Sequence, residues 1–351
     1  MIIGLKPDEN VATVLQTNTT PLSIESMTTT TQKLSRREAV ARTGALIGAA
    51  LVGGGSRTTA LAESSASVAS NHAGFVFCLN TATIRGQKLG IVKEIEAAAK
   101  AGYQAIEPWV DSIDEYRKQG GSLPDLKKRI ADAGLAVESA IGFPQWIVDD
   151  DTKREKGMEQ AKREMDLVAQ IGGKRLAAPP AGATDVPGLG LLKAAERYRA
   201  LLEAGDRIGV VPQLELWGFS KNLNRLGECA GAAIETGHPR ACVLVDVYHL
   251  YKGGSDYHGL ELLNGNAVHV LHMNDYPAEP PREKIDDSFR VFPGDGVAPV
   301  TQILRALRSI GGQKVLSLEL FNRKYWGMDA TEVVRSGLEK MKAAVGRTLS
   351  Q

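Results

Sequence analysis

The 351-residue chain is 43% hydrophobic and 24% charged, an ordinary globular composition with enough apolar material for one large α/β domain and additional segments. Its 42 basic and 41 acidic residues give a net charge of +1, which excludes the broad positive surface that nucleic acids and anionic membranes attract. Three cysteines, none in a CxxC pair and all in apolar surroundings, exclude a disulfide framework and argue against a structural zinc site.

Residues 1–62 have the pattern of an export signal. Paired arginines, Arg36 and Arg37, precede a short uncharged apolar run at 43–55, and a small-x-small site for signal peptidase follows at 60–62. The apolar run is too short and too rich in glycine to cross a bilayer, so we expect no stable membrane span. The paired arginines resemble a twin-arginine signal, except that Ala39 stands where such signals carry a bulky apolar residue.

This interpretation places the mature N-terminus near Glu63 and the mature protein in the periplasm or another extracytoplasmic space. Residues 63–74 then form a polar linker. A start at Met27 would give a signal of more usual length, because the region before the arginines is otherwise long. The alternative interpretation of the whole region is a disordered basic tail.

From residue 75 to 347 short apolar runs alternate with amphipathic ones. We expect eight strands at the apolar runs 75–80, 103–109, 135–141, 174–179, 210–217, 241–247, 267–273 and 314–320. Strands that alternate with helices indicate a parallel sheet, and eight such units in about 270 residues match a single-domain α/β fold, the (β/α)8 TIM barrel. The alternative, an open doubly wound sheet, usually has a glycine-rich loop after its first strand, whereas residues 80–84 (NTATI) contain no glycine.

The segments between these strands have the spacing of helices with one buried face. Apolar residues recur at three- and four-residue steps, for example at Met158, Ala161, Met165 and Val168. Glycines fall where four of the helices should end, a position that favours a left-handed C-cap; they are Gly102, Gly134, Gly172 and Gly209.

Acidic side chains and one histidine stand at the carboxyl ends of predicted strands. Glu215, Asp246, His272 and Glu319 end strands five to eight, and Glu107 ends strand two. In a barrel these ends meet on one face, where ionised carboxylates are costly unless they are paired or bind metal. Three carboxylates and one imidazole suit one divalent cation, Mn²⁺, Mg²⁺, Co²⁺ or Zn²⁺. For any one of these residues alone a salt bridge would be the better interpretation, but four on successive strands favour a metal site.

The motifs around these residues resemble those of the xylose isomerase-like sugar isomerases and epimerases. That family has a Glu on strand five, Asp-x-x-His after strand six, a His on strand seven, an Arg before a Pro-Gly-x-Gly turn, and a Glu on strand eight. The corresponding segments of this chain, within residues 75–345, are QLELWG, VDVYH, HVLHMND, FRVFPGDG and LSLEL.

The resemblance implies a fold, a metal site and a class of reaction. It implies that Glu215, Asp246, His272 and Glu319 bind the cation and that Glu215 and Glu319 also exchange protons with the substrate from opposite faces. The implied activity is isomerisation or epimerisation of a small carbohydrate through a metal-bound enediolate.

Other residues are candidates for substrate binding. The resemblance implies substrate contacts for His249 and Arg290. Glu107 suits either a substrate hydroxyl or a structural hydrogen bond inside the barrel. Trp109 and Trp217 lie just past strand ends, where an indole ring can stack on a sugar face or pack the rim of the barrel.

Three other functions use the same barrel. A lyase or dehydratase acting on a keto-sugar or an oxidised glycoside would need the same metal site. A nuclease similar to endonuclease IV is less favoured, because it needs several zinc ions and more histidines than the six of this chain, together with affinity for phosphates. A sugar-binding module without activity would not need both Glu215 and Glu319. We expect no nucleic-acid partner, and the sequence is compatible with a homo-oligomer.

Overall fold

The structure, a computed structural model, describes residues 74–350. The predicted signal region at 1–62 and the predicted linker, except Gly74, lie outside these residues, so export remains a prediction. Within the described part of the chain, none of the helices combines the length and the apolar character that crossing a bilayer requires.

Eight parallel strands form one sheet in the order β3-β2-β1-β8-β7-β6-β5-β4. Their bounds are β1 Phe75–Asn80, β2 Ala105–Glu107, β3 Ala136–Val137, β4 Arg175–Ala178, β5 Val211–Glu215, β6 Val243–Asp246, β7 Val270–Met273 and β8 Lys314–Leu318. Two hydrogen bonds join the edges: the N–H of Ala140 donates to the carbonyl of Arg175 (3.1 Å), and the N–H of Ala177 donates to the carbonyl of Ala140 (2.9 Å). The predicted (β/α)8 barrel is confirmed, with strands that are mostly shorter than the apolar runs that predicted them.

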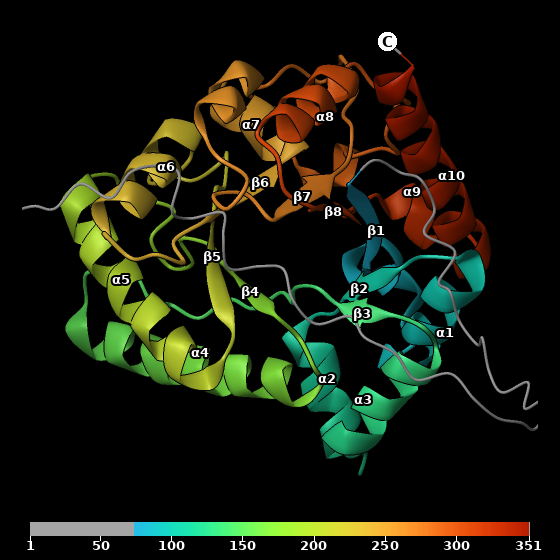
Figure 1. Ribbon diagram of the computed structural model, residues 1–351, viewed down its shortest axis with the longest axis horizontal. Coiled ribbons are helices and arrows are strands. Elements are labelled where there is room, and N and C mark those ends of the chain that lie inside the picture. The colour runs from blue at the N-terminus through green and yellow to red at the C-terminus, as the bar shows by residue number, and fades with distance from the viewer. Residues whose placement is uncertain (1–73, 351) are drawn as a thin grey trace, which may run out of the picture. The chain divides into compact units, whose positions relative to one another are not determined.

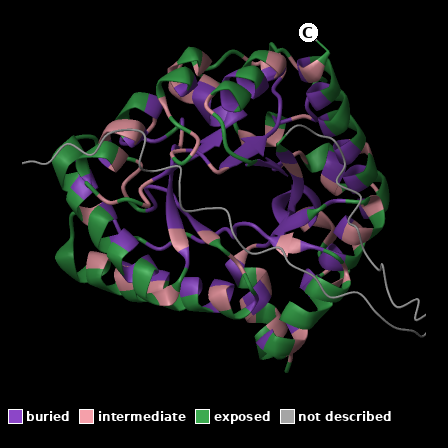
Figure 2. Cartoon of the chain, viewed as in Figure 1, coloured by how far each residue is buried: buried purple, intermediate pink, exposed green. Residues whose placement is uncertain are grey.

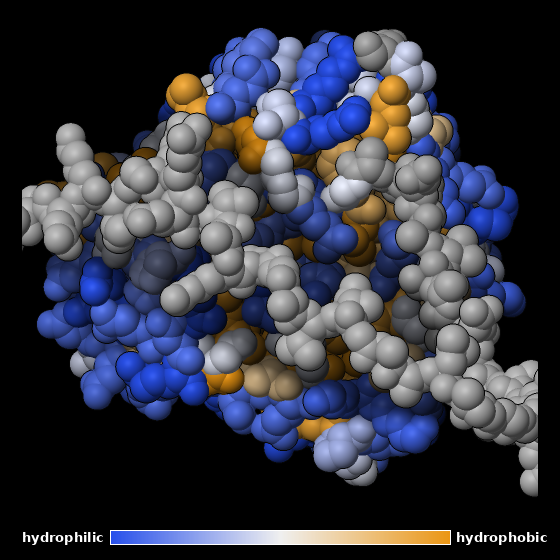
Figure 3. Space-filling view, in the orientation of Figure 1, coloured by the Kyte–Doolittle hydropathy of each residue, from blue (hydrophilic) through white to orange (hydrophobic). Residues whose placement is uncertain are grey.

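Helices surround the strands (Figure 1). The longer ones are α1 Ile91–Ala101, α2 Val110–Lys118, α3 Leu123–Asp132, α4 Asp151–Gln170, α5 Leu191–Ile208, α6 Leu226–Glu235, α8 Val300–Ser309 and α10 Ala330–Leu349. Shorter ones are η1 Thr81–Gln87, α7 Val247–Gly253, η2 Tyr257–Leu262, η3 Asp287–Phe289 and α9 Arg323–Trp326. Figure 2 shows the long helices buried toward the strands and exposed on the outside, as their spacing predicts. On the face seen in Figure 3, most of the periphery is hydrophilic with a few hydrophobic patches, and further hydrophobic residues show toward the centre.

Two of the four predicted glycine C-caps are confirmed, and the other two glycines have the predicted left-handed backbone one residue beyond the C-caps Ala133 and Ile171. Gly102 and Gly209 follow α1 and α5 with φ angles of 92° and 91°. Gly134 and Gly172 follow α3 and α4 with φ angles of 71° and 83°. A left-handed backbone of this kind is less favourable for a residue with a Cβ than for glycine. Glycine therefore suits these positions, where the helix ends and the chain turns back toward the next strand.

The register of the sheet directs the strand-end side chains to one side. Glu215 pairs with Leu244, two residues before Asp246, and Asp246 pairs with His272. His272 pairs with Ser317, two residues before Glu319. Because alternate residues of a strand share a face, all four of the predicted metal ligands point into the barrel at the carboxyl ends of the strands.

Tyr198 on α5 fixes the strands that carry two of these ligands. Its buried hydroxyl lies 2.8 Å from the carbonyl oxygen of Cys242 and 3.0 Å from that of Pro212. The same hydroxyl accepts hydrogen bonds from the backbone N–H groups of Cys242 (3.2 Å) and Leu214 (3.3 Å). The phenol therefore joins the beginning of β6 to β5, so that it supports the relative position of Glu215 and Asp246 at the other end.

We expect Tyr198→Phe to lower the free energy of unfolding by about 1–3 kcal/mol, because it leaves buried backbone groups without a partner. Tyr116→Phe is the matched control, since the Tyr116 hydroxyl donates to Asp125 at the partly exposed α2–α3 surface and its loss should cost less than about 0.5 kcal/mol. Urea denaturation followed by circular dichroism measures both. Equal losses in the two variants would contradict this role of Tyr198.

Candidate functional site

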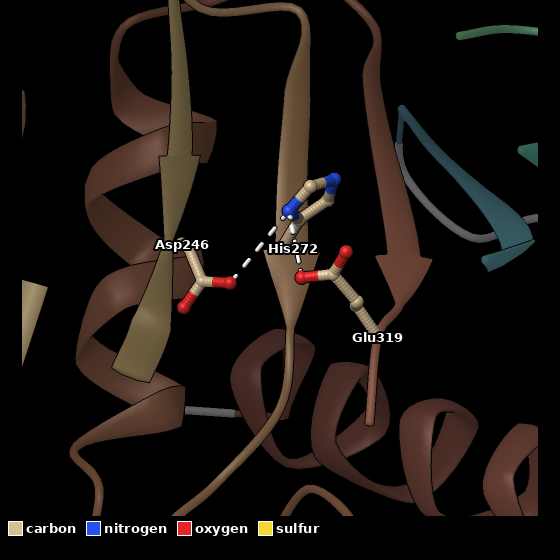
Figure 4. Close-up of side chains that lie close together, drawn as sticks. All are labelled: Asp246, His272 and Glu319. Atoms are coloured by element: carbon tan, nitrogen blue, oxygen red, sulfur yellow. Dashed lines mark ion pairs between the residues drawn. The ribbon is translucent and has the colours of Figure 1, made fainter. Parts of the chain in front are cut away.

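Asp246, His272 and Glu319 converge inside the barrel from the ends of β6, β7 and β8 (Figure 4). All three are buried, and the ligand atoms that they offer lie within 4.8 Å of one another. His272 Nδ1 is 3.1 Å from Glu319 Oε2 and 3.6 Å from Asp246 Oδ2. One cation could contact all three side chains with small adjustments.

Glu215, the fourth predicted ligand, lies at the edge of this group. Its Oε1 is 3.6 Å from His272 Nδ1, but it does not belong to the compact trio of Asp246, His272 and Glu319. The structure therefore brings Glu215 to the same histidine nitrogen, and its binding to the cation remains a prediction.

The two nitrogens of His272 have different surroundings. Nε2 lies 3.1 Å from Glu107 Oε2, whereas the buried Nδ1 makes no hydrogen bond within the described residues. When Nε2 donates its proton to Glu107, Nδ1 directs a lone pair at the oxygens of Asp246 and Glu319. A buried lone pair among carboxylates is unfavourable unless a proton or a cation lies between them, so these residues fit a divalent cation with mixed nitrogen and oxygen ligands.

Glu107 lies below the pocket and supports His272. It is fully buried, and its Oε2 accepts hydrogen bonds from Asn80 Nδ2 (3.0 Å) and Ser317 Oγ (2.6 Å) as well as facing His272. Glu107 is not among the residues that line the pocket described below. The structural interpretation accounts for the contacts of Oε2, whereas the buried Oε1 makes no hydrogen bond within the described residues. The histidine–carboxylate pair fixes the orientation of the imidazole.

Arg290 binds the same carboxylates from the side of the pocket. Its Nη1 donates to Asp246 Oδ2 and to Glu319 Oε2, both at 2.8 Å, and Nη2 pairs with Asp287 and lies 3.1 Å from His249 Nε2. The guanidinium is 1% exposed, so these charge-assisted bonds are screened little by water. Arg290 thus offsets part of the negative charge that the two ligands place inside the barrel.

Asn80, at the end of β1, is a site residue that the sequence did not reveal. Its Nδ2 donates to Glu107 Oε2 and to Glu319 Oε1, both at 3.0 Å, and its Oδ1 accepts from Trp109 Nε1 at 3.1 Å. One side chain therefore orients a ligand carboxylate, its supporting carboxylate and an aromatic residue of the pocket. The available signal was a polar residue at the end of the first apolar run, the position that the four predicted ligands share on other strands.

Burial and charge change the protonation of the site in the absence of a cation. Burial, reinforced by the charges of Glu319 and Asp246 and opposed by His272, raises the pKa of Glu215 to about 8. Burial alone would lower the pKa of His272, but Glu319 and Glu107 outweigh it and hold that pKa well above its usual value. Burial would raise the pKa of Asp246, but Arg290 and the neighbouring histidines hold it below its usual value. Glu215 and His272 therefore keep protons near neutral pH until a cation displaces them.

A pocket of about 350 Å³ opens next to the candidate metal site. Of the residues that the sequence singled out, those that line it are Trp109, Glu215, Trp217, His249, Arg290 and Glu319. Asp246, His272 and Glu107 lie deeper and do not line it. Of the four predicted metal ligands, Glu215 and Glu319 reach the pocket, and these are the two with a predicted acid–base role.

Known proteins share the fold of this chain. The family model described as a xylose isomerase-like TIM barrel matches residues 95–344. An inosose isomerase of Bacillus velezensis is 26% identical over 285 residues, which cover 77% of this chain and 97% of that protein. A 3-dehydroshikimate dehydratase of Pseudomonas putida is 22% identical over 251 residues, which cover 71% of this chain and 39% of that protein. A crystal structure of the IOLI protein with a bound zinc atom matches with a TM-score of 0.73 at 22% identity, covering 79% of this chain and 100% of that chain.

We expect the purified protein to bind about one divalent cation per chain and Asp246→Ala or His272→Ala to lose it, because each variant removes a central ligand. Metal content after equilibration with Mn²⁺ or Zn²⁺ and gel filtration, measured by mass spectrometry, tests this. His258→Ala is the matched control, since the His258 side chain is 64% exposed and belongs neither to the trio nor to the pocket lining. Wild-type stoichiometry and affinity in Asp246→Ala would show that the ligand assignment is wrong.

We also expect cation affinity to fall as the pH is lowered from about 9 to about 6, because cation binding must displace protons whose pKa values are raised in the cation-free protein. About two protons should be released per cation near neutral pH, one from His272 and one from Glu215, whose pKa is about 8. Titration calorimetry in buffers of different ionisation enthalpy counts them, and Glu215→Gln should release about one fewer. Affinity that does not change with pH would rule out this protonation scheme.

Proposed function

The chain belongs to the xylose isomerase-like TIM barrel family, and on this premise we propose that it is a metal-dependent sugar isomerase or epimerase. It moves a proton at a carbon next to the carbonyl group of a small carbohydrate. One observation carries the proposal: Glu215 and Glu319 both line the pocket, and both approach His272 Nδ1, at 3.6 and 3.1 Å. A carboxylate pair that faces substrate at a metal site suits proton transfer better than simple binding.

Asp246, His272 and Glu319, with Glu215 as the fourth, would hold the cation. When bound, a divalent cation acts as a Lewis acid that polarises a carbonyl oxygen and makes the neighbouring C–H more acidic. The mixed carboxylate and imidazole donors suit Zn²⁺, Mn²⁺, Co²⁺ or Mg²⁺, and zinc is the metal found in the IOLI structure.

The protein's own residues would then move the proton. Glu319 is held on both oxygens, by Asn80 at Oε1 and by Arg290 at Oε2. These bonds keep the carboxylate in one orientation, as a general base requires. Glu215 comes from the end of β5 and Glu319 follows the end of β8, so that one glutamate would remove the proton and the other would return it to the opposite face. Return to the same carbon gives an epimer, and return to the neighbouring carbon gives an isomer.

His249 and Arg290 would contact the substrate or hold the ligands in place. His249 receives a hydrogen bond at Nδ1 from the N–H of Gly218 (3.2 Å), which leaves Nε2 directed at Arg290 and the pocket. Because Nδ1 accepts, the neutral imidazole carries its proton on Nε2, so His249 can donate to a substrate hydroxyl when Arg290, itself a donor, shifts slightly.

A dehydratase is the second candidate. The similarity to a 3-dehydroshikimate dehydratase supports it, although the chain covers well under half of that relative. Elimination begins with the same removal of a proton next to a carbonyl group and differs only in the loss of a hydroxyl from the next carbon. The residues named above serve both reactions, and the product distinguishes them.

We expect the metal-loaded protein to exchange the C–H next to the carbonyl group of its substrate with D₂O, and we expect Glu319→Gln to slow this exchange by at least about 100-fold. The amide keeps the size and one oxygen of the carboxylate but cannot take up the proton. Proton NMR in D₂O with inosose, 3-dehydroshikimate and L-ribulose as probes measures exchange and identifies the product. Glu261→Gln, at an exposed position of η2, is the matched control and should exchange at the wild-type rate.

Full activity in Glu319→Gln would remove Glu319 from the mechanism. Exchange that persists at the wild-type rate after complete removal of metal by a chelator would contradict the metal dependence itself.

A further inference from the structure

Aromatic rings from several loops form a continuous belt around the pocket. The Trp109 ring lies 5.1 Å from that of Phe143 and 6.1 Å from that of Phe321. Phe143 lies 5.8 Å from Trp217, and Trp217 lies 5.2 Å from Phe219. We call these five rings, Trp109, Phe143, Trp217, Phe219 and Phe321, the aromatic belt; all of them line the pocket.

Two polar residues close the belt. Phe219 lies 5.8 Å from the ring of His249, whose Nε2 is 3.1 Å from Arg290 Nη2. The Arg290 guanidinium lies over the Phe321 ring, 5.1 Å from its centre. Because Phe321 neighbours Trp109, the circle of contacts is closed. The loops that follow β2, β3, β5, β6, β7 and β8 all contribute, so the belt surrounds the mouth of the barrel next to Glu215 and Glu319.

The charge of the lining disfavours an anionic substrate. Among the described residues that line the pocket, the carboxylates of Glu215, Asp287 and Glu319 outnumber the guanidiniums of Arg290 and Arg323. Arg290 is already bound by Asp246, Glu319 and Asp287, and the lining contains no lysine. A phosphate group would therefore find no free cationic side chain in the lining except the exposed Arg323, because the other guanidinium is held by carboxylates and Glu215 and Glu319 are the residues proposed to bind the cation.

The outer part of the belt offers more apolar surface than one sugar ring needs. Phe143 is 38% exposed and Phe219 is 44% exposed, and both contact Trp217. Neighbouring exposed aromatic rings at the mouth of a pocket are typical of a binding surface, and flat apolar groups stack on them. When one ring of a ligand lies beside Glu215 and Glu319, the platform formed by Phe143, Trp217 and Phe219 remains available to another part of the same ligand.

We infer that the substrate is a neutral two-ring carbohydrate conjugate. Its keto-bearing ring lies beside Glu215 and Glu319, and a second, flat apolar ring packs against Phe143, Trp217 and Phe219. The position of the reactive ring rests on the proposed function, whereas the second ring rests on the platform alone. The pocket volume of about 350 Å³ lies within the usual range for sites that enclose a ligand larger than a single small ring.

Binding of two unreactive glucosides to the metal-loaded full chain tests this inference, and glucose and glucose 6-phosphate are compared beside them. We expect phenyl β-D-glucopyranoside to bind about tenfold more tightly than methyl β-D-glucopyranoside, because aromatic contacts of the phenyl ring add to those of the shared sugar. Glucose 6-phosphate should bind no more tightly than glucose. Quenching of tryptophan fluorescence, with calorimetry as a second method, measures all four affinities.

Variants of the platform separate the second ring from the first. Phe143→Ala and Phe219→Ala should each reduce the preference for the phenyl glucoside to about threefold or less and leave the affinity for the methyl glucoside unchanged. Phe289→Ala is the matched control, since Phe289 is 39% exposed but does not line the pocket. Thermal melts followed by circular dichroism confirm that all three variants are folded.

Equal affinities of the wild type for the two glucosides would overturn the inference. So would a phenyl preference that survives both platform variants, tighter binding of glucose 6-phosphate than of glucose, or no binding of either glucoside up to the solubility limit. Because these measurements need no turnover, a missing phenyl preference together with normal C–H exchange refutes this inference alone. A normal preference without exchange refutes the proposed function alone.

Discussion

Four carboxylates buried around one imidazole are the constraint on which the rest of the site depends. Glu107, Glu215, Asp246 and Glu319 all approach His272, and each of the five side chains is less than one-tenth exposed. Desolvation of so much negative charge requires compensating partners, because burial of an unpaired carboxylate in a real protein costs on the order of several kcal/mol. The protein provides one cationic group, Arg290, and protons; a divalent cation beside Nδ1 would supply the remainder. The site therefore fits a divalent cation, and the barrel keeps the carboxylates together in the structure without one.

The same constraint connects the metal site to the pocket. Asn80 holds Glu319 and Glu107 with its amide nitrogen and receives the indole N–H of Trp109 at its oxygen. On its other face, Trp109 lies 4.3 Å below the guanidinium of Arg85. A shift of the Glu319 carboxylate would thus be felt by an aromatic residue that lines the pocket. Through this coupling one rigid shell can position both Glu319 and an aromatic wall of the pocket.

Much of this could be read from the sequence, because periodicity and strand-end chemistry are local signals. All eight strands follow from them, as does the convergence of Asp246, His272 and Glu319 at the strand ends. Strand lengths are overestimated: the apolar run at 103–109 contains only Ala105–Glu107 as strand, since Trp109 already precedes α2 and lines the pocket. Asn80 escaped notice because a single amide after an apolar run has no pattern of its own. The contacts of Arg290 depend on how the long loop after β7 folds back over the barrel, and no spacing in the sequence encodes that closure.

Anomalous diffraction from crystals of the Mn²⁺-loaded protein tests the central claim most directly. Our account predicts one strong peak per chain, at about 2.0–2.3 Å from His272 Nδ1 and from carboxylate oxygens of Asp246 and Glu319, with His272 Nε2 still bound to Glu107. A crystal that binds Mn²⁺ elsewhere and leaves His272 Nδ1 without a metal, or one in which the metal binds Nε2 in place of Nδ1, would contradict it.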